Sequence, residues 1–516
     1  MKKSTPPRIL FPIICQAIFV KNFTENLQEN LKKLKKELPS EDILTYSFET
    51  QDGVAAAIIY ADGIINKQLL GDLIARPLSQ LNLKKDGGRY ENTADFIEKS
   101  ALFPELKRAE DIPAACKEIL DGNSVFLVDT SPICFVVGAK LLPNRAVMEP
   151  PTDVAVKGPR EGFIEDIKTN MALVRKRLKT PDLRFETLRL GKRSDTAVTV
   201  CYLEGTCRKE VKEEIKAKLQ AFALDVVPDS SYISAILSPR THSLFHSLGT
   251  TEKPDVFTAK LAEGRVGVLV DGSPIALTAP YLLTETLQSS EDYFVSPFVA
   301  TGFRFLRFIA LLVALLLPAF YVAAQLFKMQ LLPLGLMLTI AGSVREIPLS
   351  PSLELFVVLL LLETLKEASI RMPKYVGMSL SVVGALVLGE TAVSAGFLST
   401  PAIIIVAFSG ICLYTVPNFV ETGSILRWIL LFVAGSIGPF GIVLTIAFLL
   451  YYLITADGFG APLLAPFSPF TAHDLRDTVV KLNMQSLARR PRVLRSPNKT
   501  RYKKLSAQSA EKGENE

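Results

Sequence analysis

The spacing of hydrophobic positions changes once along the chain. Up to about residue 300, apolar runs are short and charged residues are frequent. Across residues 303–452 the apolar runs lengthen to about 20 residues, which is the length that an α-helix needs to cross a bilayer. The pattern therefore predicts a soluble α/β region followed by an all-α, multi-span transmembrane domain.

The soluble region alternates helix-like and strand-like segments. Residues 24–36 carry leucines at helical spacing, and residues 64–76 form a second helical pattern after the Asp62-Gly63 turn. Residues 54–60 and 125–128 are short apolar runs, typical of buried strands. This alternation favours compact units built from a sheet and its covering helices.

One order of residues recurs at a fixed distance in the soluble region. Tyr60-Ala-Asp-Gly63 matches Tyr202-Leu-Glu-Gly205, and 202 − 60 = 142. Leu127-Val-Asp129 matches Leu269-Val-Asp271 at the same offset. The constant offset predicts two tandem, similar α/β subdomains of common ancestry, each with its own small core.

These patterns divide the chain into six parts. The parts are an N-terminal extension (1–21), soluble subdomain 1 (22–148), a linker (149–163), soluble subdomain 2 (164–297), a transmembrane helical domain (298–456) and a basic cytoplasmic tail (457–516).

Four segments are long and apolar enough to cross a membrane. They are residues 305–327, 375–395, 401–420 and 425–454. Residues 331–371 stay open between a re-entrant segment, an interfacial segment and a pair of further spans. Four spans place both chain ends on one side. Arg304, Arg307 and the basic tail predict that this side is the cytoplasm, by the positive-inside rule.

Polar residues at membrane depth are costly, so each is a candidate functional group. The candidates are Glu363, Lys366, Glu367, Glu390, Asn418 and Glu421. The first three share one helical face because their spacing is i, i+3 and i+4, and the other three lie near span ends. Two interpretations stay open: a polar pathway or gate between subunits, and interfacial charges that pair with one another or with lipid headgroups.

Small residues suggest where the helices pack and where one of them breaks. A stripe at every fourth position lets helices approach closely, and it consists of Gly377, Ser381, Ala385 and Gly389. A second cluster falls in the middle of residues 425–454 and consists of Gly435, Gly438, Pro439 and Gly441. This cluster predicts a kinked or broken helix, either lining a cavity or tolerated without a role.

The net charge is +6, and much of it falls near the end of the chain. Eight basic residues follow one another there without an acid: Arg489, Arg490, Arg492, Arg495, Lys499, Arg501, Lys503 and Lys504. An arm that binds nucleic acid is one interpretation. Their position directly after the spans favours a cytoplasmic tail near anionic lipid, so we expect no nucleic-acid partner.

The sequence shows no pattern typical of catalysis or metal binding. Its six cysteines form no C-x-x-C pair, and it has three histidines. A nucleophile elbow and a dinucleotide fingerprint are both missing. We therefore expect a protein without enzymatic activity, metal or cofactor.

Six short motifs occur together along the chain. The soluble region contains Val156-Lys-Gly-Pro-Arg-Glu-Gly-Phe163, Thr251-Glu-Lys-Pro-Asp255 and Ser289-Ser-Glu-Asp-Tyr293. The later part contains Arg371-Met-Pro373, Val416-Pro-Asn418 and Ala465-Pro-Phe467. In this combination, from about Asn22 to Phe470, the chain resembles the A subunit of GerA-type spore germinant receptors. The first 20 residues have no clear counterpart, and Leu359 stands where the family often has an acid.

The resemblance implies a multi-pass protein of the spore inner membrane, with its N-terminal region and tail on the core (cytoplasmic) side. It implies a receptor complex with a multi-span B subunit and a lipoprotein C subunit. Such complexes sense small germinants and trigger germination, with the B subunit as the expected germinant binder. The A subunit is expected to form a homo-oligomer with an ion-conducting pore.

Two other functions remain as alternatives. One is a stand-alone ion or solute transporter with a cytoplasmic regulatory domain, which inverted repeats among the spans would favour. The other is a membrane-anchored enzyme whose soluble half binds a small molecule.

Overall fold

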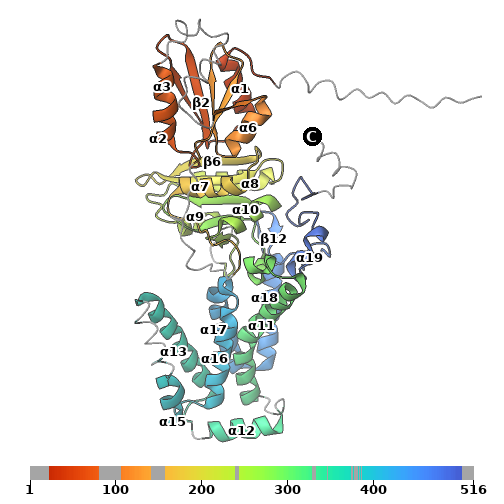
Figure 1. Ribbon diagram of the computed structural model, residues 1–516. Coiled ribbons are helices and arrows are strands. Elements are labelled where there is room, and N and C mark those ends of the chain that lie inside the picture. The colour runs from red at the N-terminus through yellow and green to blue at the C-terminus, as the bar shows by residue number, and fades with distance from the viewer. Residues whose placement is uncertain are drawn as a thin grey trace, which may run out of the picture.

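The structure is a computed structural model that describes residues 22–80, 106–140, 157–238, 243–327, 330, 333–345, 347–373, 376, 382, 384 and 386–502. The expected N-terminal extension and residues 149–156 of the expected linker lie outside this description. The described chain is elongated, with two sheets at one end and a helical region at the other (Figure 1).

Subdomain 1 is a five-stranded antiparallel sheet with helices on both faces. Its strand order is β1-β2-β4-β5-β3. The strands are β1 (Ile43–Glu49), β2 (Ala55–Ala61), β3 (Leu106–Ala109), β4 (Ser124–Val128) and β5 (Cys134–Val137). The helices are α1 (Leu27–Glu37), α2 (Lys67–Leu70), the π-helical turn η1 (Gly71–Ala75), α3 (Arg76–Ser79) and α6 (Ile112–Leu120). Strand β4 is buried along its whole length, as its unbroken apolar run predicts.

Subdomain 2 has the same architecture, with the strand order β6-β7-β9-β10-β8. The strands are β6 (Leu183–Leu190), β7 (Thr196–Leu203), β8 (Gly249–Thr251), β9 (Val266–Val270) and β10 (Ala276–Ala279). The helices are α7 (Ile167–Arg177), α8 (Lys209–Ala221), α9 (Ser230–Leu237) and α10 (Pro254–Glu263). Both sheets pair antiparallel throughout the described strands, so neither has the crevice of a parallel α/β sheet.

Strand register shows how closely the two subdomains correspond. Ile43 pairs with Ala61 in subdomain 1, and Leu183 pairs with Leu203 in subdomain 2. The offset is 183 − 43 = 140 at the first strand and 203 − 61 = 142 at the second. The β6–β7 hairpin is therefore two residues longer than the β1–β2 hairpin, and the constant offset of 142 begins at the second strand of the hairpin.

The repeated Leu-Val-Asp motif has the same structural role in both subdomains. A carboxylate oxygen of Asp129 accepts a hydrogen bond from the backbone N–H of Leu27 at 3.0 Å. Asp271 accepts the equivalent bond from Ile167 at 3.3 Å. Each aspartate ends a buried strand and binds a free N–H group at the start of the first helix, where negative charge is favoured.

A buried ion pair joins the two subdomains. The Arg175 guanidinium of α7 donates from Nε to Asp42 Oδ2 at 2.9 Å and from Nη2 to Asp42 Oδ1 at 2.8 Å. The same side chain donates to the backbone oxygen of Thr180 at 3.0 Å, and it lies over the Phe185 ring. Both charged side chains are almost fully buried, so this contact fixes subdomain 1 on subdomain 2.

The helical region follows two 3₁₀ turns, η3 (Leu283–Leu287) and η4 (Ser290–Tyr293). Its elements are α11 (Pro297–Phe327), α12 (Leu334–Val344), α13 (Pro351–Arg371), η6 (Val387–Thr391), α15 (Ala392–Ser394), α16 (Thr400–Tyr414), η7 (Pro417–Phe419), α17 (Val420–Ile437) and α18 (Pro439–Thr455). Two helices, Pro297–Phe327 and Pro417–Ile437, are long and apolar enough to cross a membrane. Helices α12, α16 and α18 are apolar but shorter.

Residues 425–454 form parts of two helices rather than the single expected span. The break falls at Gly438, whose φ of 76° lies in a region that favours glycine. Pro439 then begins α18, where the fixed φ of proline suits the first helical position and its missing N–H costs no helical hydrogen bond.

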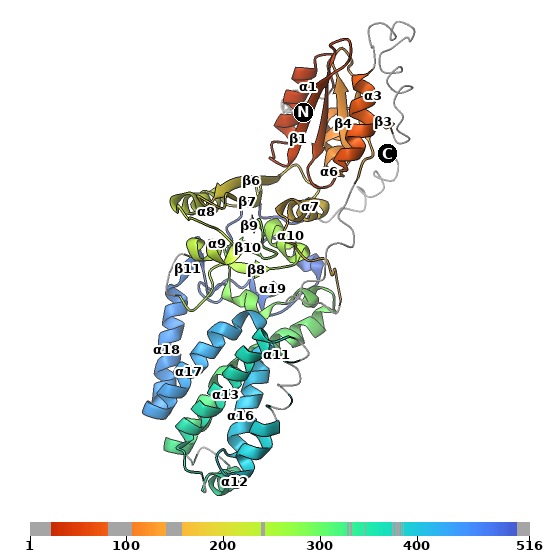
Figure 2. The same cartoon turned by 90° about the vertical axis from the view of Figure 1, so that its left-hand side faces the viewer.

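The two helices form a hairpin whose ends return to subdomain 2. At the start of α17, the Thr422 hydroxyl donates to the backbone oxygen of Leu244 at 2.6 Å. Near the end of α18, the Tyr452 hydroxyl bonds to Ser243 Oγ at 2.9 Å. Figure 2 shows α17 and α18 side by side below the sheet of subdomain 2. Of the two predicted outcomes, a kinked or a broken helix, the structure has the break, and the chain reverses its direction there.

The segment after the hairpin, which the sequence predicts to be a basic tail near lipid, packs against subdomain 2. It contains β11 (Asp457–Gly458), β12 (Ala461–Pro462), α19 (Leu475–Thr478) and the 3₁₀ turn η8 (Met484–Ser486). Arg490 Nε donates to the backbone oxygen of Ala262 at 2.7 Å, and Ser496 Oγ donates to that of Thr206 at 2.6 Å. Val493 and Leu494 are buried between the basic residues, and their burial explains why the segment docks.

Candidate functional site

A cluster of buried polar groups lies inside the helical region. The Arg427 guanidinium of α17 donates from Nη2 to Glu363 Oε1 of α13 at 3.1 Å. Ser424 Oγ donates to the same carboxylate oxygen at 2.7 Å, and Lys366 Nζ lies 3.1 Å from Glu363 Oε2. The Arg427 side chain is 1% exposed and that of Glu363 is 22% exposed. This arrangement forms an ion pair within an otherwise apolar bundle, which we call the Glu363 cluster.

Four helices contribute to the Glu363 cluster. Arg427 Nη1 lies 3.3 Å from Ser409 Oγ of α16, and this hydroxyl donates to the backbone oxygen of Ala314 in α11 at 2.8 Å. Arg427 Nε has no hydrogen-bond partner within the described part of the chain. One arginine thus connects α17 to α13 directly and to α11 through Ser409, so movement of one helix disturbs the others.

A second polar group lies at the end of the bundle that is remote from the sheets. Glu354 of α13 is fully buried, and one of its oxygens accepts a hydrogen bond from the backbone N–H of Ser399, the N-cap of α16. Its other oxygen, Oε2, has no partner among the residues that the structure describes. Nearby, Gln325 donates to the Tyr321 hydroxyl at 2.9 Å. Glu354 therefore places negative charge at the starts of both α13 and α16.

The structure brings together two of the six predicted polar residues, Glu363 and Lys366. Glu367 instead pairs with Arg371 on the exposed face of α13. The other three are exposed and lie apart from the cluster: Glu390, Asn418 and Glu421. Four of the six candidates are thus exposed, so the six do not form one cluster within a single chain. Both interpretations of these residues, a polar pathway or gate between subunits and interfacial charges, stay predictions.

The predicted packing stripe is mostly outside the described residues. Gly377, Ser381 and Ala385 are among the positions that the structure does not describe, and Gly389 is exposed in η6. In the hairpin, a Cβ at Gly435 would lie 2.5 Å from Ser352 Oγ, and one at Gly441 would lie 2.6 Å from a Val433 methyl group. These two glycines therefore allow close approach of α17 to α13 and to α18.

A third cluster joins subdomain 2, the start of α11 and the C-terminal segment. Asp292 of η4 is fully buried and accepts hydrogen bonds from Arg304 Nε at 3.0 Å and from Arg307 Nη2 at 2.8 Å. Lys481 Nζ donates to the backbone oxygen of Asp292 at 3.0 Å and lies over the Tyr293 ring. We call these five residues the junction cluster.

Electrostatics at the junction depends on burial and on pairing. Burial alone would raise the pKa of Asp292, but hydrogen bonds from Arg307 and Arg304 outweigh it and hold that pKa below its usual range. Burial lowers the pKa of Lys481 to about 8, against the opposing attraction of Asp477. The charged form of Asp292 is therefore stabilised in the folded chain, whereas the charged form of Lys481 is destabilised by burial.

Sequence reasoning missed Arg427, Glu354 and the site role of Asp292. A lone arginine in the apolar run 425–454 was a usable signal, because an unpaired charge there is costly and implies a partner. Glu354 gave a weaker signal, since an acid in the first turn of a helix is common. Within the described residues no group of three or more His, Cys, Asp or Glu side chains could hold a metal ion.

Comparison with known proteins identifies the family. Residues 9–493 match the family model described as Bacillus/Clostridium GerA spore germination protein. Spore germination protein KA of Bacillus subtilis (strain 168) is 30% identical over 501 residues, which are 96% of this chain and 90% of that protein. The uncharacterized membrane protein YfkQ of the same strain is 33% identical over 452 residues, or 87% of each chain.

One further relative and one solved structure are similar to this chain. Spore germination protein GerLA of Bacillus cereus is 30% identical over 472 residues, or 91% of this chain and 95% of that protein. A crystal structure of the N-terminal domain of the A subunit of the Bacillus megaterium spore germinant receptor GerK3 is 29% identical and covers 51% of this chain and 98% of its own, with a TM-score of 0.40. The family match begins before Asn22 and ends beyond Phe470, so it includes most of the docked C-terminal segment. The resemblance seen in the sequence is confirmed: this chain belongs to the Bacillus/Clostridium GerA spore germination protein family.

Proposed function

We propose that this chain is the A subunit of a spore germinant receptor, which takes part in sensing small-molecule germinants and triggers spore germination. The match of residues 9–493 to the GerA family carries the proposal. Two of the named relatives, KA and GerLA, are spore germination proteins, and they align with this chain over most of their own length. The chain contributes to a complex with a multi-span B subunit and a lipoprotein C subunit.

The chain is a multi-pass protein of the spore inner membrane, with its soluble region and its C-terminal segment on the core side. Two helices of suitable length and three shorter apolar ones support this arrangement. The contacts of Thr422 with Leu244 and of Tyr452 with Ser243 return the last hairpin to the side of subdomain 2. Arg304 and Arg307 lie at that same side, in keeping with the positive-inside rule.

The junction cluster transmits the state of the soluble region to the membrane helices. Asp292 lies just before α11, while its partners Arg304 and Arg307 lie within it. Lys481 holds the C-terminal segment to the same point. A buried, hydrogen-bonded ion pair tolerates little displacement, so rotation of subdomain 2 is passed to α11.

The membrane part forms a homo-oligomeric, ion-conducting pore. A buried Glu363–Arg427 pair in an apolar bundle is costly, and such groups mark ion or proton paths in membrane proteins. The exposed residues Glu390, Asn418 and Glu421 are free to face a second copy of the chain or lipid headgroups. The small-residue stripe that includes Gly389 is a packing surface for helices of such an assembly.

The decisive experiment deletes the chain in its spore-forming host, in a strain that lacks other GerA-type receptors. Spores are then exposed to a germinant panel while release of monovalent cations is followed. We expect the response to at least one germinant to disappear and to return with the wild-type chain. Unchanged cation release toward every germinant would contradict the proposal.

Single substitutions separate the pore from the junction. Glu363→Gln should alter the rate of cation release, whereas Glu367→Gln, about one helical turn further on but exposed, should leave it unchanged. Asp292→Asn should weaken the response to germinant while the chain still reaches the membrane. Equal behaviour of Glu363→Gln and Glu367→Gln would contradict a role of the Glu363 cluster in conduction.

A further inference from the structure

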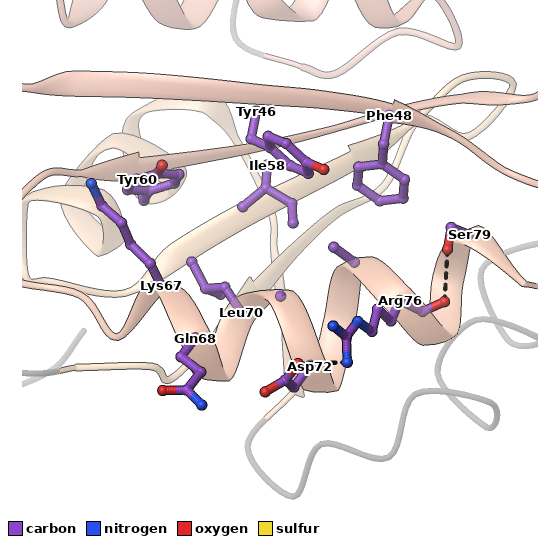
Figure 3. Close-up of a pocket in the computed structure, with 12 residues that line it drawn as sticks. Tyr46, Phe48, Ile58, Tyr60, Lys67, Gln68, Leu70, Asp72, Arg76 and Ser79 are labelled. Carbon is purple, nitrogen blue, oxygen red and sulfur yellow. Dashed lines mark hydrogen bonds and ion pairs between the residues drawn. The ribbon is translucent and has the colours of Figure 1, made fainter.

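Subdomain 1 contains a cavity of about 400 Å³ between its sheet and the helical stretch α2–η1–α3. The rings of Tyr46, Phe48 and Tyr60 point from strands β1 and β2 toward the helix (Figure 3). Lys67 lies at the Tyr60 end of the cavity, and Arg76 lies nearer to Phe48. This volume falls within the range of small-molecule sites, about 300–1,000 Å³.

Subdomain 2 provides an internal comparison for this cavity. The same face of its sheet is covered by α8, a regular helix of 13 residues that buries Val211, Ile215 and Leu219. In subdomain 1 the equivalent stretch is interrupted by the π-helical turn Gly71–Ala75. Insertions of this kind are frequent at functional sites, because the extra residue re-aims side chains and opens the local packing.

The residues that line the cavity in subdomain 1 also differ from those at the equivalent positions of subdomain 2. Tyr60 corresponds to Tyr202 at the offset of 142, and Tyr46 corresponds to Glu186 at the offset of 140 that applies to the first strand. In subdomain 2, Glu186 accepts hydrogen bonds from the Tyr202 hydroxyl and pairs with Lys216, so these polar groups satisfy one another. In subdomain 1 an aromatic ring replaces that carboxylate, and the space stays open.

The chemistry of the walls defines what would bind. Tyr46 and Phe48 stack with their centroids 5.9 Å apart, and Tyr60 continues this aromatic wall. Lys67 pairs with Asp62 at 2.7 Å, and Arg76 pairs with Asp72 at 3.1 Å. Both cations are at least half exposed, so a ligand anion can take over either pairing at little cost.

We propose that subdomain 1 binds a small aromatic carboxylate in this cavity, with the ring against Tyr46, Phe48 and Tyr60 and the carboxylate on Lys67 or Arg76. Aromatic stacking and a charge-assisted hydrogen bond are the two interactions that the walls offer. The inference rests on subdomain 1 alone and stands apart from the proposed role in germination.

The test is a titration of the full-length chain in detergent with benzoate, L-phenylalanine and indole-3-acetate, followed by calorimetry. Benzamide serves as the uncharged comparison. We expect saturable binding of at least one carboxylate with a Kd below about 1 mM, and binding of benzamide at least about tenfold weaker. Saturable binding of none of the three carboxylates to the wild-type chain overturns the proposal, and equal binding of benzamide overturns the assignment of a carboxylate.

Gly71→Leu is the decisive variant because it fills the cavity without disturbing the backbone. A Cβ at residue 71 would meet no atom within 4 Å, and its backbone is already helical. Leucine also favours a helix over glycine, so the melting temperature should not fall. We expect binding to weaken at least about tenfold. Gly342→Leu, at an exposed glycine of α12 whose Cβ also meets open space, is the matched control and should bind like wild type.

A second variant tests the same cavity without filling it, in case Gly71→Leu lowers the melting temperature. Lys67→Gln and Arg76→Gln together remove both cations from the rim and leave the aromatic wall unchanged. This double variant should lose affinity for the carboxylates but not for benzamide. Wild-type affinity in Gly71→Leu, or in the double variant, overturns the proposal.

Discussion

The Arg427 guanidinium lies 3.1 Å from the Glu363 carboxylate although the two residues stand 64 positions apart in the chain. The arginine is almost completely buried, and the acid is largely so. An arginine cannot lose its proton, so its burial among apolar helices is tolerable only with an anion beside it. The pair therefore fixes the relative positions of α13 and α17.

Replacing Glu363 by Gln should strongly destabilise the helical region. The substitution leaves Arg427 buried without its anion, which costs about 3–5 kcal/mol in comparable buried pairs. We expect a clear drop in the apparent melting temperature of the detergent-solubilised chain. Glu367→Gln, in an exposed pair with Arg371, should have little effect, and Glu363→Gln combined with Arg427→Gln should recover part of the loss. A double variant no more stable than Glu363→Gln alone would argue against the pair.

Replacing Asp42 by Asn should loosen the contact between the two subdomains. Arg175 would keep its bond to the Thr180 carbonyl but lose its bidentate partner in a buried site. We expect a loss of about 3–5 kcal/mol in the free energy of unfolding and faster proteolysis between the subdomains. The control is Asp225→Asn, which breaks the exposed pair with Arg193. If both variants unfold alike, the buried pair does not hold the subdomains together.

Lys481 makes the stability of the junction depend on pH. Its pKa is about 8 in the folded chain, because burial lowers it from an ordinary value of 10.5. Between these two values the unfolded chain binds more protons than the folded chain, so stability increases as pH rises. Relative to Lys481→Met, the free energy of unfolding of wild type should increase by up to about 3 kcal/mol across this pH window. Melting curves of both proteins from pH 7 to 10.5 measure the difference, and parallel curves would refute the assignment.

Phe459 should be essential for subdomain 2 although it follows α18, the last helix of the helical region. Its ring is buried in the core of that subdomain, with Lys218 Nζ 4.5 Å from the ring centroid. The residue has a φ of 54°, a conformation in which Asn is favoured over Phe. Phe459→Asn should nevertheless destabilise the protein, because the lost ring costs about 3–5 kcal/mol in a packed core.

Phe470 provides the matched comparison for Phe459. It lies in the same C-terminal segment but is 70% exposed. Phe470→Asn should leave the melting temperature of the full-length chain unchanged. If both substitutions act equally, the ring of Phe459 does not belong to the core of subdomain 2.

The fold of the soluble region could be predicted because the motifs that determine it are short and occur twice in the sequence. One such motif is Leu127-Val-Asp129, which is repeated at residues 269–271. Each copy ends a buried strand with the aspartate that binds the start of a helix. The family assignment follows from such motifs in combination. The two-residue difference in length between the β1–β2 and β6–β7 hairpins could not be predicted, because the sequences of β1 and β6 show no recognisable similarity.

The helical region was less predictable because its decisive partners are distant in sequence. The position of the break at Gly438 and Pro439 was visible, but a kink and a reversal have the same local residues. Only tertiary contacts such as that of Thr422 with Leu244 decide between them. The pairing of Arg427 with Glu363 could not be predicted for the same reason, because it depends on which helices pack side by side.

The docking of the C-terminal segment on subdomain 2 was not predicted, because basic residues dominate the composition of this segment. Arg489 and Arg490 suggested a lipid-facing tail, yet Val493 and Leu494 beside them are buried against the protein. Two apolar residues among many basic ones give no periodic signal. Their burial follows from the surface that subdomain 2 happens to present.

The placement of Phe459 in the core of subdomain 2 has a consequence for how the protein is made. A ribosome completes the strands of that subdomain long before it reaches the residue that fills their core. The core of subdomain 2 therefore stays incompletely packed until the helical region has been translated. A chain that stalls or is cleaved before residue 459 would leave the place of the Phe459 ring empty in the core of subdomain 2, so we expect it to be cleaved by proteases more readily than the full-length chain.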